Sequence, residues 1–186
     1  ICVEATGATS GEFIIDTCSC PGSKSFGMAI RMKNNGRIIS CDLHKSKLSL
    51  VEKGAERLSI DIIETREIDG RKTVDEWLGR ADRVLCDVPC SGLGVIRRKP
   101  DIKYKPQDDF KELVSVQRQI LQNAADYLSS GGKLLYSTCT LNKAENKENV
   151  DDFLSKNKEF SLIFENTFSP EENNADGFYA AVLVKN

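Results

Sequence analysis

The sequence has little histidine and no long apolar run. His44 is the one histidine among 186 residues, and the cysteines form no pair of CxxC knuckles, so the pattern of a zinc site is missing. No apolar run reaches the ~18 residues that a transmembrane helix needs. The net charge is −2, which excludes a chain that coats nucleic acid with uniform positive charge. We therefore expect neither a metal nor a membrane as partner, and a nucleic-acid contact must come from a local patch.

The remaining composition is that of one folded domain. Hydrophobic residues make up 40% and charged residues 29% of the chain, which is ordinary for a soluble globular protein. A length of 186 residues corresponds to a single domain. The chain begins at Ile1, and its two methionines are Met28 and Met32. We therefore expect residues 1–186 to be part of a longer protein.

The cysteines are too few for a disulfide scaffold, and their odd number leaves at least one thiol unpaired. They are Cys2, Cys18, Cys20, Cys41, Cys86, Cys90 and Cys139. Four of them lie in or next to apolar runs, as small apolar residues or site residues do in a reducing compartment. We expect free thiols and a cytoplasmic protein.

Apolar runs typical of strands alternate with amphipathic stretches typical of helices. The strand-like runs are residues 13–15, 37–41, 60–64, 84–86, 134–137, 160–164 and 178–184. The spacing predicts helices over residues 24–33, 44–58 and 107–128, and a capping box of Asn142 and Glu145 opens another that continues to residue 156. This alternation predicts an α/β fold with a doubly wound, mostly parallel sheet.

Two details of this pattern lend themselves to a direct check. In the helix over residues 44–58 we expect one apolar face, made by Leu43, Leu50, Val51 and Leu58. Residues 89–106 hold three prolines and two glycines, which predicts a long irregular loop. Loops of this length tend to be functional.

Acidic residues stand at the ends of three predicted strands, where doubly wound sheets bind their ligands. These are Asp16, Asp42 and Asp87. Asp42 follows Gly22 by 20 residues, the spacing at which an acid binds a ribose hydroxyl; capping of the next helix is the alternative for Asp16 and Asp42. Because the turn holds one glycine and no GxGxxG, it favours a nucleoside cofactor without phosphates, such as S-adenosylmethionine.

Two other turns each hold a cysteine directly after a strand. Pro89 and Gly92 flank Cys90, and Cys139 precedes a predicted helix whose N-terminus lowers the pKa of a thiol. A single cysteine of this kind is more often a buried apolar residue. Two of them at adjacent strand ends, beside Asp87, favour reactive thiols.

Four segments follow one another in a fixed order along the chain. They read DTCSCPGSK at 16–24, DVPCSGLGVIRRKPDIKY at 87–104, YSTCT at 136–140 with Glu145 and Asn146 behind it, and DGFYAA at 176–181. Together they resemble the cofactor loop, the central motif, the second cysteine motif and the closing strand of the Sun family of RNA cytosine-5 methyltransferases. The family's cofactor loop reads DxCAAPGGK, so Cys20 and Ser23 replace an alanine and a glycine. This departure concerns cofactor affinity, because Ser23 adds a Cβ there.

The resemblance implies a Rossmann-like class I methyltransferase fold, with seven strands and an antiparallel C-terminal strand. Residues 1–186 are then the catalytic domain of a longer, monomeric protein, with an RNA-binding domain before Ile1. The implied reaction transfers a methyl group from S-adenosylmethionine to carbon 5 of a cytosine in RNA through a covalent cysteine adduct. Ribosomal RNA is the first substrate to consider and tRNA the alternative; a non-catalytic S-adenosylmethionine- or RNA-binding module is a further one.

The resemblance also assigns roles to residues. Cys139 is the attacking thiol, Cys90 assists release of the product, and Asp87 contacts the cytosine ring. The residues implied for cofactor binding are Cys18, Ser19, Cys20, Pro21, Gly22, Ser23, Lys24, Asp42, Asp69 and Asp87. Asp69 rests on the short segment DGR at 69–71, and a plain turn aspartate is its alternative.

A cluster of positive charge continues from the central motif. It consists of Arg97, Arg98, Lys99, Lys103 and Lys105, against the single acid Asp101. A solvated charge run is the ordinary interpretation, but its place next to the motif favours contact with RNA phosphates. Tyr104 is a candidate for stacking on a base.

Two rival activities remain at this point. In DNA cytosine-5 methyltransferases the thiol of the Pro-Cys turn attacks, which here is Cys90. A nucleotide-dependent oxidoreductase is the more distant rival, because the glycine-rich fingerprint is absent from the sequence.

Overall fold

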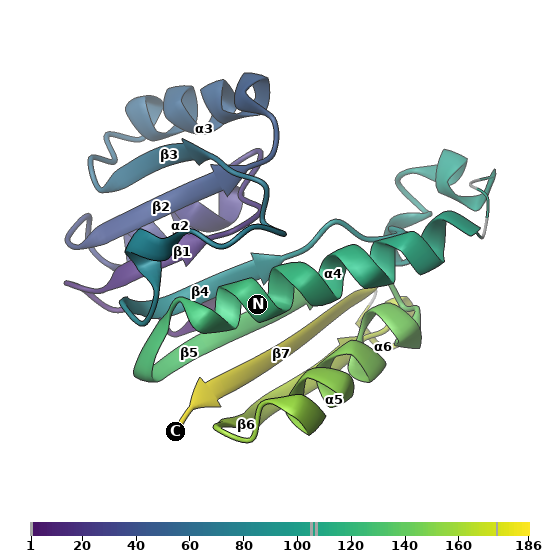
Figure 1. Cartoon of the computed structure of the whole chain (residues 1–186). Coiled ribbons are helices and arrows are strands. Elements are labelled where there is room, and N and C mark those ends of the chain that lie inside the picture. Colours follow the sequence, from purple (N-terminus) through teal and green to yellow (C-terminus); the bar gives the residue numbers. More distant parts are fainter. Residues whose placement is uncertain (1, 105, 107, 174) are drawn as a thin grey trace.

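A central sheet carries helices on both faces (Figure 1) in the computed structural model, which describes residues 2–104, 106, 108–173 and 175–186. The strands are β1 Phe13–Asp16, β2 Arg37–Asp42, β3 Ile63–Glu67, β4 Ala81–Asp87, β5 Leu128–Thr138, β6 Phe160–Phe168 and β7 Phe178–Lys185. The α-helices are α1 Cys2–Thr6, α2 Ser23–Arg31, α3 Lys45–Arg57, α4 Asp108–Asp126, α5 Lys147–Lys156 and α6 Pro170–Asn173. Short 3₁₀ helices are η1 Asp75–Trp77, η2 Leu93–Val95, η3 Pro100–Tyr104 and η4 Lys143–Glu145.

The sheet has seven strands in the order β3-β2-β1-β4-β5-β7-β6. Strands β1 to β5 pair in parallel, and β7 runs antiparallel to both β5 and β6. The order reverses between β1 and β4, and a doubly wound sheet binds its ligand at such a switch point. The predicted α/β class, the seven strands and the antiparallel C-terminal strand are confirmed.

Alternate residues of the strands point into two separate apolar cores. Ile14 and Leu85 pack with Met28 of α2 on one face, while Ile15 and Val84 contribute to the core on the other face. Figure 1 shows α4 lying across the sheet next to β4 and β5. Both faces of the central strands are therefore covered, as in all mostly parallel sheets.

Two predictions about local structure need correction. The third strand begins at Ile63 rather than at residue 60. Ile60 is buried, but its backbone N–H donates to the carbonyl oxygen of Ala55 at the end of α3 and so is not available to the sheet. The segment over residues 89–106 contains η2 and η3 and so is not wholly irregular; it extends beyond the sheet at the right of Figure 1.

The predicted apolar face of α3 is wrong in most of its members. Leu50 is 54% exposed, and Leu43 and Leu58 lie outside the helix and are also exposed. The buried stripe runs through Leu48, Val51 and Ala55, which follow one another at spacings of three and four residues. None of the helices in the described part of the chain is long and apolar enough to cross a membrane.

Candidate active site

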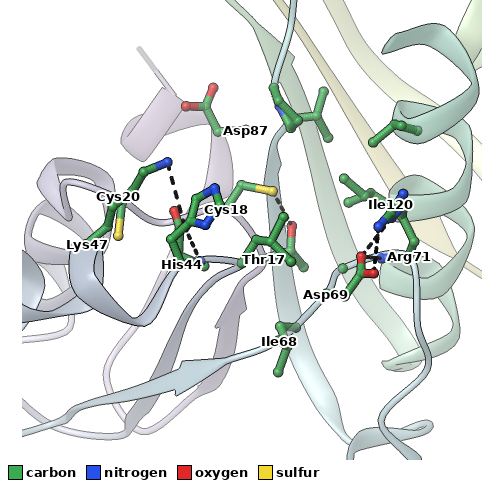
Figure 2. A pocket seen from close by; sticks show the side chains of 16 residues that line it. Thr17, Cys18, Cys20, His44, Lys47, Ile68, Asp69, Arg71, Asp87 and Ile120 are labelled. Atoms are coloured by element: carbon green, nitrogen blue, oxygen red, sulfur yellow. Dashed lines mark hydrogen bonds and ion pairs between the residues drawn. The ribbon is translucent and has the colours of Figure 1, made fainter. Parts of the chain in front are cut away.

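A cavity of about 440 Å³ lies at the carboxyl ends of the parallel strands. Its wall is formed by Thr17, Cys18, Cys20, Asp42, Leu43, His44, Lys47, Ile68, Asp69, Gly70, Arg71, Asp87, Val88, Pro89, Val116 and Ile120. Figure 2 shows Cys20, His44 and Lys47 on one side and Asp69, Arg71 and Ile120 on the other. The cavity therefore stands where the switch point of the sheet predicts a ligand.

The turn between β1 and α2 is shaped by contacts of its own residues. The Ser19 hydroxyl donates to the carbonyl oxygen of Cys41 at 3.0 Å. Gly22 has a φ of 104°, and a Cβ there would lie 2.6 Å from the ring of Phe26, so glycine is required. Cys18 and Cys20 thereby reach the cavity wall, whereas Ser19, Pro21 and Gly22 shape the turn behind it.

Ser23 and Lys24 face a different cavity from the rest of this turn. They belong to the first turn of α2 and line a second hollow of about 460 Å³, together with Cys2, Asp176 and Phe178. Ser23, where the family has glycine, therefore lines the second cavity and not the first.

Two of the acids predicted to bind the cofactor, Asp42 and Asp69, are held by close sequence neighbours. Asp42 Oδ1 accepts from the backbone N–H of His44 at 2.9 Å. Asp69 accepts from both Nε and Nη2 of Arg71 at 2.8 Å, and these bonds hold the pKa of Asp69 below its ordinary value. Asp69 thus lines the cavity with its charge already paired.

Asp16 does not line the cavity. Its side chain is fully buried, and Oδ2 accepts from the Ser25 hydroxyl at 2.7 Å, which in turn accepts from the Ser40 hydroxyl at 2.8 Å. Oδ1 has no hydrogen-bond partner. Burial and the nearby charge of Asp87 raise the pKa of Asp16 to about 7. Neither of the two alternatives for Asp16, ribose contact or helix cap, describes this environment.

Asp87, at the end of β4, lies between the cavity and the two cysteine turns. Its Oδ2 accepts from Lys24 Nζ at 2.5 Å, and its Oδ1 accepts from the Ser137 hydroxyl at 2.7 Å. Burial opposes the charge of Lys24, but the ion pair with Asp87 outweighs it and raises the pKa of the ammonium group. A carboxylate and an ammonium group are thus fixed side by side next to the thiols.

The two cysteine turns meet. Cys90 Sγ lies 3.2 Å from Cys139 Sγ, within hydrogen-bonding distance for sulfur. The hydrogen bond with Cys90 lowers the pKa of Cys139 to about 7. All seven cysteines are described and free, and Cys139 is the one whose pKa falls; burial raises the pKa of Cys18, and burial with Asp42 raises that of Cys20 to about 11. Cys139 is therefore the most readily ionised thiol.

Glu145 belongs to the second cysteine segment, but its contact with the first cysteine turn was not predicted. The capping box predicts a carboxylate that turns back to the backbone of Asn142. Instead the Asn142 side chain caps the backbone N–H of Ala144 at 3.2 Å, and the Glu145 carboxylate is fully buried against Ser91, the neighbour of Cys90. The box pattern is the same for both arrangements, so nothing local in the sequence distinguishes them.

The central motif also contacts the segment before β7. The backbone N–H of Gly94 donates to the carbonyl oxygen of Cys139 at 3.0 Å, and that of Gly177 donates to the carbonyl oxygen of Gly94 at 2.8 Å. Arg98 forms an ion pair with Asp176. Three of the segments singled out in the sequence are therefore joined around Cys139.

The predicted RNA-binding residues divide into two groups. Arg98 and Lys99 line a cavity of about 410 Å³ into which Cys90 and Cys139 open. Arg97 and Lys103 are exposed on the surrounding surface. Lys105 lies outside the described residues. Tyr104 is 78% exposed.

Several wall residues of the 440 Å³ cavity were not predicted. His44 and Lys47 lie within five residues of Asp42, at the start of α3. Their closeness to a predicted site residue in the sequence could have indicated them. Val116 and Ile120 come from α4, which is distant in the sequence and gives no such signal. Among the described residues no group of three or more histidine, cysteine or acidic side chains could hold a metal ion.

Comparison with known proteins decides the family. The model of the family described as 16S rRNA methyltransferase RsmB/F matches residues 5–184. The chain belongs to the RsmB/F family. The matched range contains Asp87, both cysteine turns and the whole wall of the 440 Å³ cavity. The match therefore includes the candidate site as well as the sheet and helices around it.

Two curated relatives and one solved structure are similar to this chain over most of its length. The probable ribosomal RNA small subunit methyltransferase B of Bacillus subtilis is 44% identical over 81% of this chain and 34% of its own length. Ribosomal RNA small subunit methyltransferase B of Yersinia enterocolitica is 36% identical over 99% of this chain and 44% of its own. NSun6 from Pyrococcus horikoshii superposes with a TM-score of 0.89 at 30% identity, covering 99% of this chain and 50% of that one. The chain thus spans half or less of the length of these relatives.

Proposed function

We propose that this chain is the catalytic domain of a longer enzyme that methylates carbon 5 of a cytosine in ribosomal RNA. The observation that carries the proposal is the pair of facing thiols. Cys139 Sγ lies 3.2 Å from Cys90 Sγ, and both open into a cavity that Arg98 and Lys99 also line. Two thiols in contact, one of them with a lowered pKa, favour a reaction that proceeds through a covalent adduct.

The 440 Å³ cavity fits S-adenosylmethionine as the methyl donor. Its volume is within the range of small-molecule sites, roughly 300–1,000 Å³. Ile68, Val116 and Ile120 supply an apolar wall for an adenine ring, and Asp42 supplies a carboxylate for ribose hydroxyls. When bound, S-adenosylmethionine supplies an electrophilic methyl group. We therefore assign Cys18, Cys20 and Asp42 to its binding.

The chemistry on the cytosine begins with Cys139. Carbon 5 of cytosine is a poor nucleophile, and addition of the Cys139 thiolate to carbon 6 makes carbon 5 electron-rich. The hydrogen bond with Cys90 lowers the pKa of Cys139, so its thiolate is more populated at neutral pH than that of an ordinary cysteine. After methylation, a base removes the proton on carbon 5 and the bond between Cys139 and carbon 6 breaks.

Asp87 and Cys90 assist these steps. Asp87 is held by Lys24 and Ser137 next to the thiols, where its side chain can contact ring N3 and accept from the amino group of the cytosine, and so orient the ring for addition. Cys90 is close enough to Cys139 to assist departure of the thiol from the product.

The RNA reaches this site along the segment between β4 and α4. Arg97 and Lys103 are exposed and suited to phosphate contacts, and the exposed ring of Tyr104 is suited to stacking on a base. The target cytosine must leave its stack to contact Cys139, which favours a single-stranded or flipped-out nucleotide.

A covalent trap tests the nucleophile. RNA that carries 5-fluorocytosine cannot lose the substituent on carbon 5, so the protein–RNA adduct accumulates in the presence of S-adenosylmethionine. With the full-length protein we expect Cys139→Ala to abolish the adduct and Cys90→Ala to preserve it, as measured by denaturing gel electrophoresis. Cys41→Ala, in the core, is the matched control.

The reverse result would assign the attack to Cys90, as in DNA cytosine-5 methyltransferases. Absence of any adduct, combined with absence of heat on titration with S-adenosylmethionine, would favour a non-catalytic module. Bisulfite mapping of RNA from a deletion strain then identifies the substrate: a lost signal in ribosomal RNA supports the proposal, and one in tRNA contradicts it.

A further inference from the structure

The residues that follow the two cysteines bind each other. Ser91 comes directly after Cys90 and Thr140 directly after Cys139, and their hydroxyl oxygens are 2.8 Å apart. Both side chains are fully buried. The separation of the two thiols therefore depends on what fixes Ser91.

Glu145 fixes Ser91 at two points. Its Oε2 accepts from the backbone N–H of Ser91 at 2.8 Å, and its Oε1 accepts from the Ser91 hydroxyl at 2.5 Å. Since the Ser91 hydroxyl donates to Glu145, it is the Thr140 hydroxyl that donates to Ser91. One carboxylate thereby holds a chain of hydrogen bonds that runs from the first cysteine turn to the second.

The remaining partners of Glu145 are also donors. Gln117 Nε2 donates to Oε2 at 2.9 Å and also to the carbonyl oxygen of Pro89 at 2.9 Å, while Asn142 Nδ2 donates to Oε1 at 3.0 Å. Each oxygen of the Glu145 carboxylate thus accepts from two N–H or O–H donors, and a carboxylate has no hydrogen of its own to donate. An amide in place of Glu145 would direct its own N–H groups at some of these donors, so glutamine is no substitute at this position.

We propose that Glu145 is the positioning residue that holds Cys90 against Cys139. The consequence for the reaction rests on the function proposed above, but the geometric role does not. When the carboxylate is absent, the turn at Ser91 loses its anchor, Cys90 moves away, and the Cys139 thiolate loses its hydrogen bond. The fraction of ionised Cys139 at neutral pH then falls.

Alkylation of Cys139 as a function of pH tests this role without RNA or cofactor. Iodoacetamide reacts with the thiolate, and peptide mass spectrometry distinguishes Cys139 from the other six cysteines. In Glu145→Gln we expect the midpoint of the alkylation profile to rise from about 7 by at least about one pH unit, toward the ordinary thiol value. Glu148→Gln, an exposed neighbour in α5, is the matched control and should leave the midpoint unchanged.

The direction of the shift separates positioning from simple electrostatics. Removal of a negative charge alone stabilises a thiolate and would lower the midpoint, whereas loss of the Cys90 hydrogen bond raises it. Ser91→Ala removes the hydroxyl link without any change of charge, and should also raise the midpoint, by a smaller amount. This second variant decides the question if Glu145→Gln does not fold.

An unchanged or lowered midpoint in folded Glu145→Gln or an unchanged one in Ser91→Ala would overturn the inference. If the midpoints rise as expected while the unaltered full-length protein forms no adduct with 5-fluorocytosine RNA, the positioning role stands and the proposed function falls. The two claims are therefore tested separately.

Discussion

The two sides of the candidate site are built in different ways. On the cavity side, Asp42 is held by the backbone of His44 and Asp69 by the side chain of Arg71, each two residues further along the chain. On the thiol side, Ser91 and Glu145 are 54 residues apart and Gln117 and Glu145 are 28 apart. The first side consists of local turns, and the second of contacts between distant segments.

This difference predicts different responses to substitution. A local turn with an exposed rim can lose one contact while its neighbours stay in place, so effects should be small and confined to ligand binding. A buried network whose members share donors and acceptors fails as a unit, because each loss leaves another polar group unsatisfied. We therefore expect the thiol side to be the sensitive one.

The largest effect is expected for Gly94→Ala on the thiol side. A Cβ at Gly94 would overlap the carbonyl group of Gly177 and approach the carbonyl oxygen of Cys139 to 2.9 Å, and these backbone atoms have little room to move. We expect a loss of about 2–3 kcal/mol in the free energy of unfolding, measured by urea denaturation, and loss of the covalent adduct.

Gly70→Ala on the cavity side provides the comparison. The added Cβ would meet only the Ile120 side chain, at 3.3 Å, and that chain can shift. We expect a loss of less than about 1 kcal/mol in unfolding free energy. Equal losses in the two variants would contradict the proposed difference between the two sides.

The same difference explains how much could be predicted from the sequence. The alternation of strands and helices and the placement of Asp42, Asp87, Cys90 and Cys139 at strand ends follow from signals within a few residues: an apolar run, then a turn with an acid or a cysteine. These signals are sufficient to place the residues near one another, because the carboxyl ends of parallel strands lie at the same edge of the sheet. The contact between the two thiols required the three-dimensional structure.

No local signal predicted that Glu145 binds Ser91. The spacing of Glu145 from Asn142 is that of a capping box, and only the arrival of Ser91 from a turn 54 residues earlier redirects the carboxylate. The apolar face of α3 failed for a related reason. Leu50 is as apolar as Leu48, and which of them is buried depends on how the helix is rotated against the sheet.

Asp16 tests whether burial alone makes an acid sensitive when it lies behind the cavity and not in its wall. Its pKa is raised to about 7 by burial and by Asp87, whereas an unfolded aspartate titrates near about 3.9. Between these values the native state binds more protons than the unfolded chain, so the free energy of unfolding should fall as pH rises from about 4 to about 7.

In Asp16→Asn this decline should be reduced, since an amide does not titrate. Urea denaturation at a series of pH values measures both slopes, and Asp61→Asn at the surface serves as the control. Identical slopes in the unaltered protein and in Asp16→Asn would show that Asp16 is ionised in the native state throughout this range.

A smaller effect is expected at Asp42. The substitution Asp42→Asn keeps the shape of the side chain and can keep the bond from His44, but it removes the charged acceptor that faces the cavity. We expect titration calorimetry to show about tenfold weaker binding of S-adenosylmethionine, as for one hydrogen bond to a charged group, with unfolding free energy nearly unchanged. A fall in stability with unchanged affinity would make Asp42 a structural residue.

The smallest effect is expected at Asp69, on the opposite wall of the same cavity. Both of its carboxylate oxygens already accept from Arg71, so little acceptor capacity remains for a ligand. Asp69→Asn should therefore weaken binding of S-adenosylmethionine by less than about threefold in the same titration. A loss as large as that in Asp42→Asn would mean that the ligand displaces Arg71 from Asp69. The cavity side would then rearrange on binding, and the contact between Asp69 and Arg71 would exist only in the ligand-free protein.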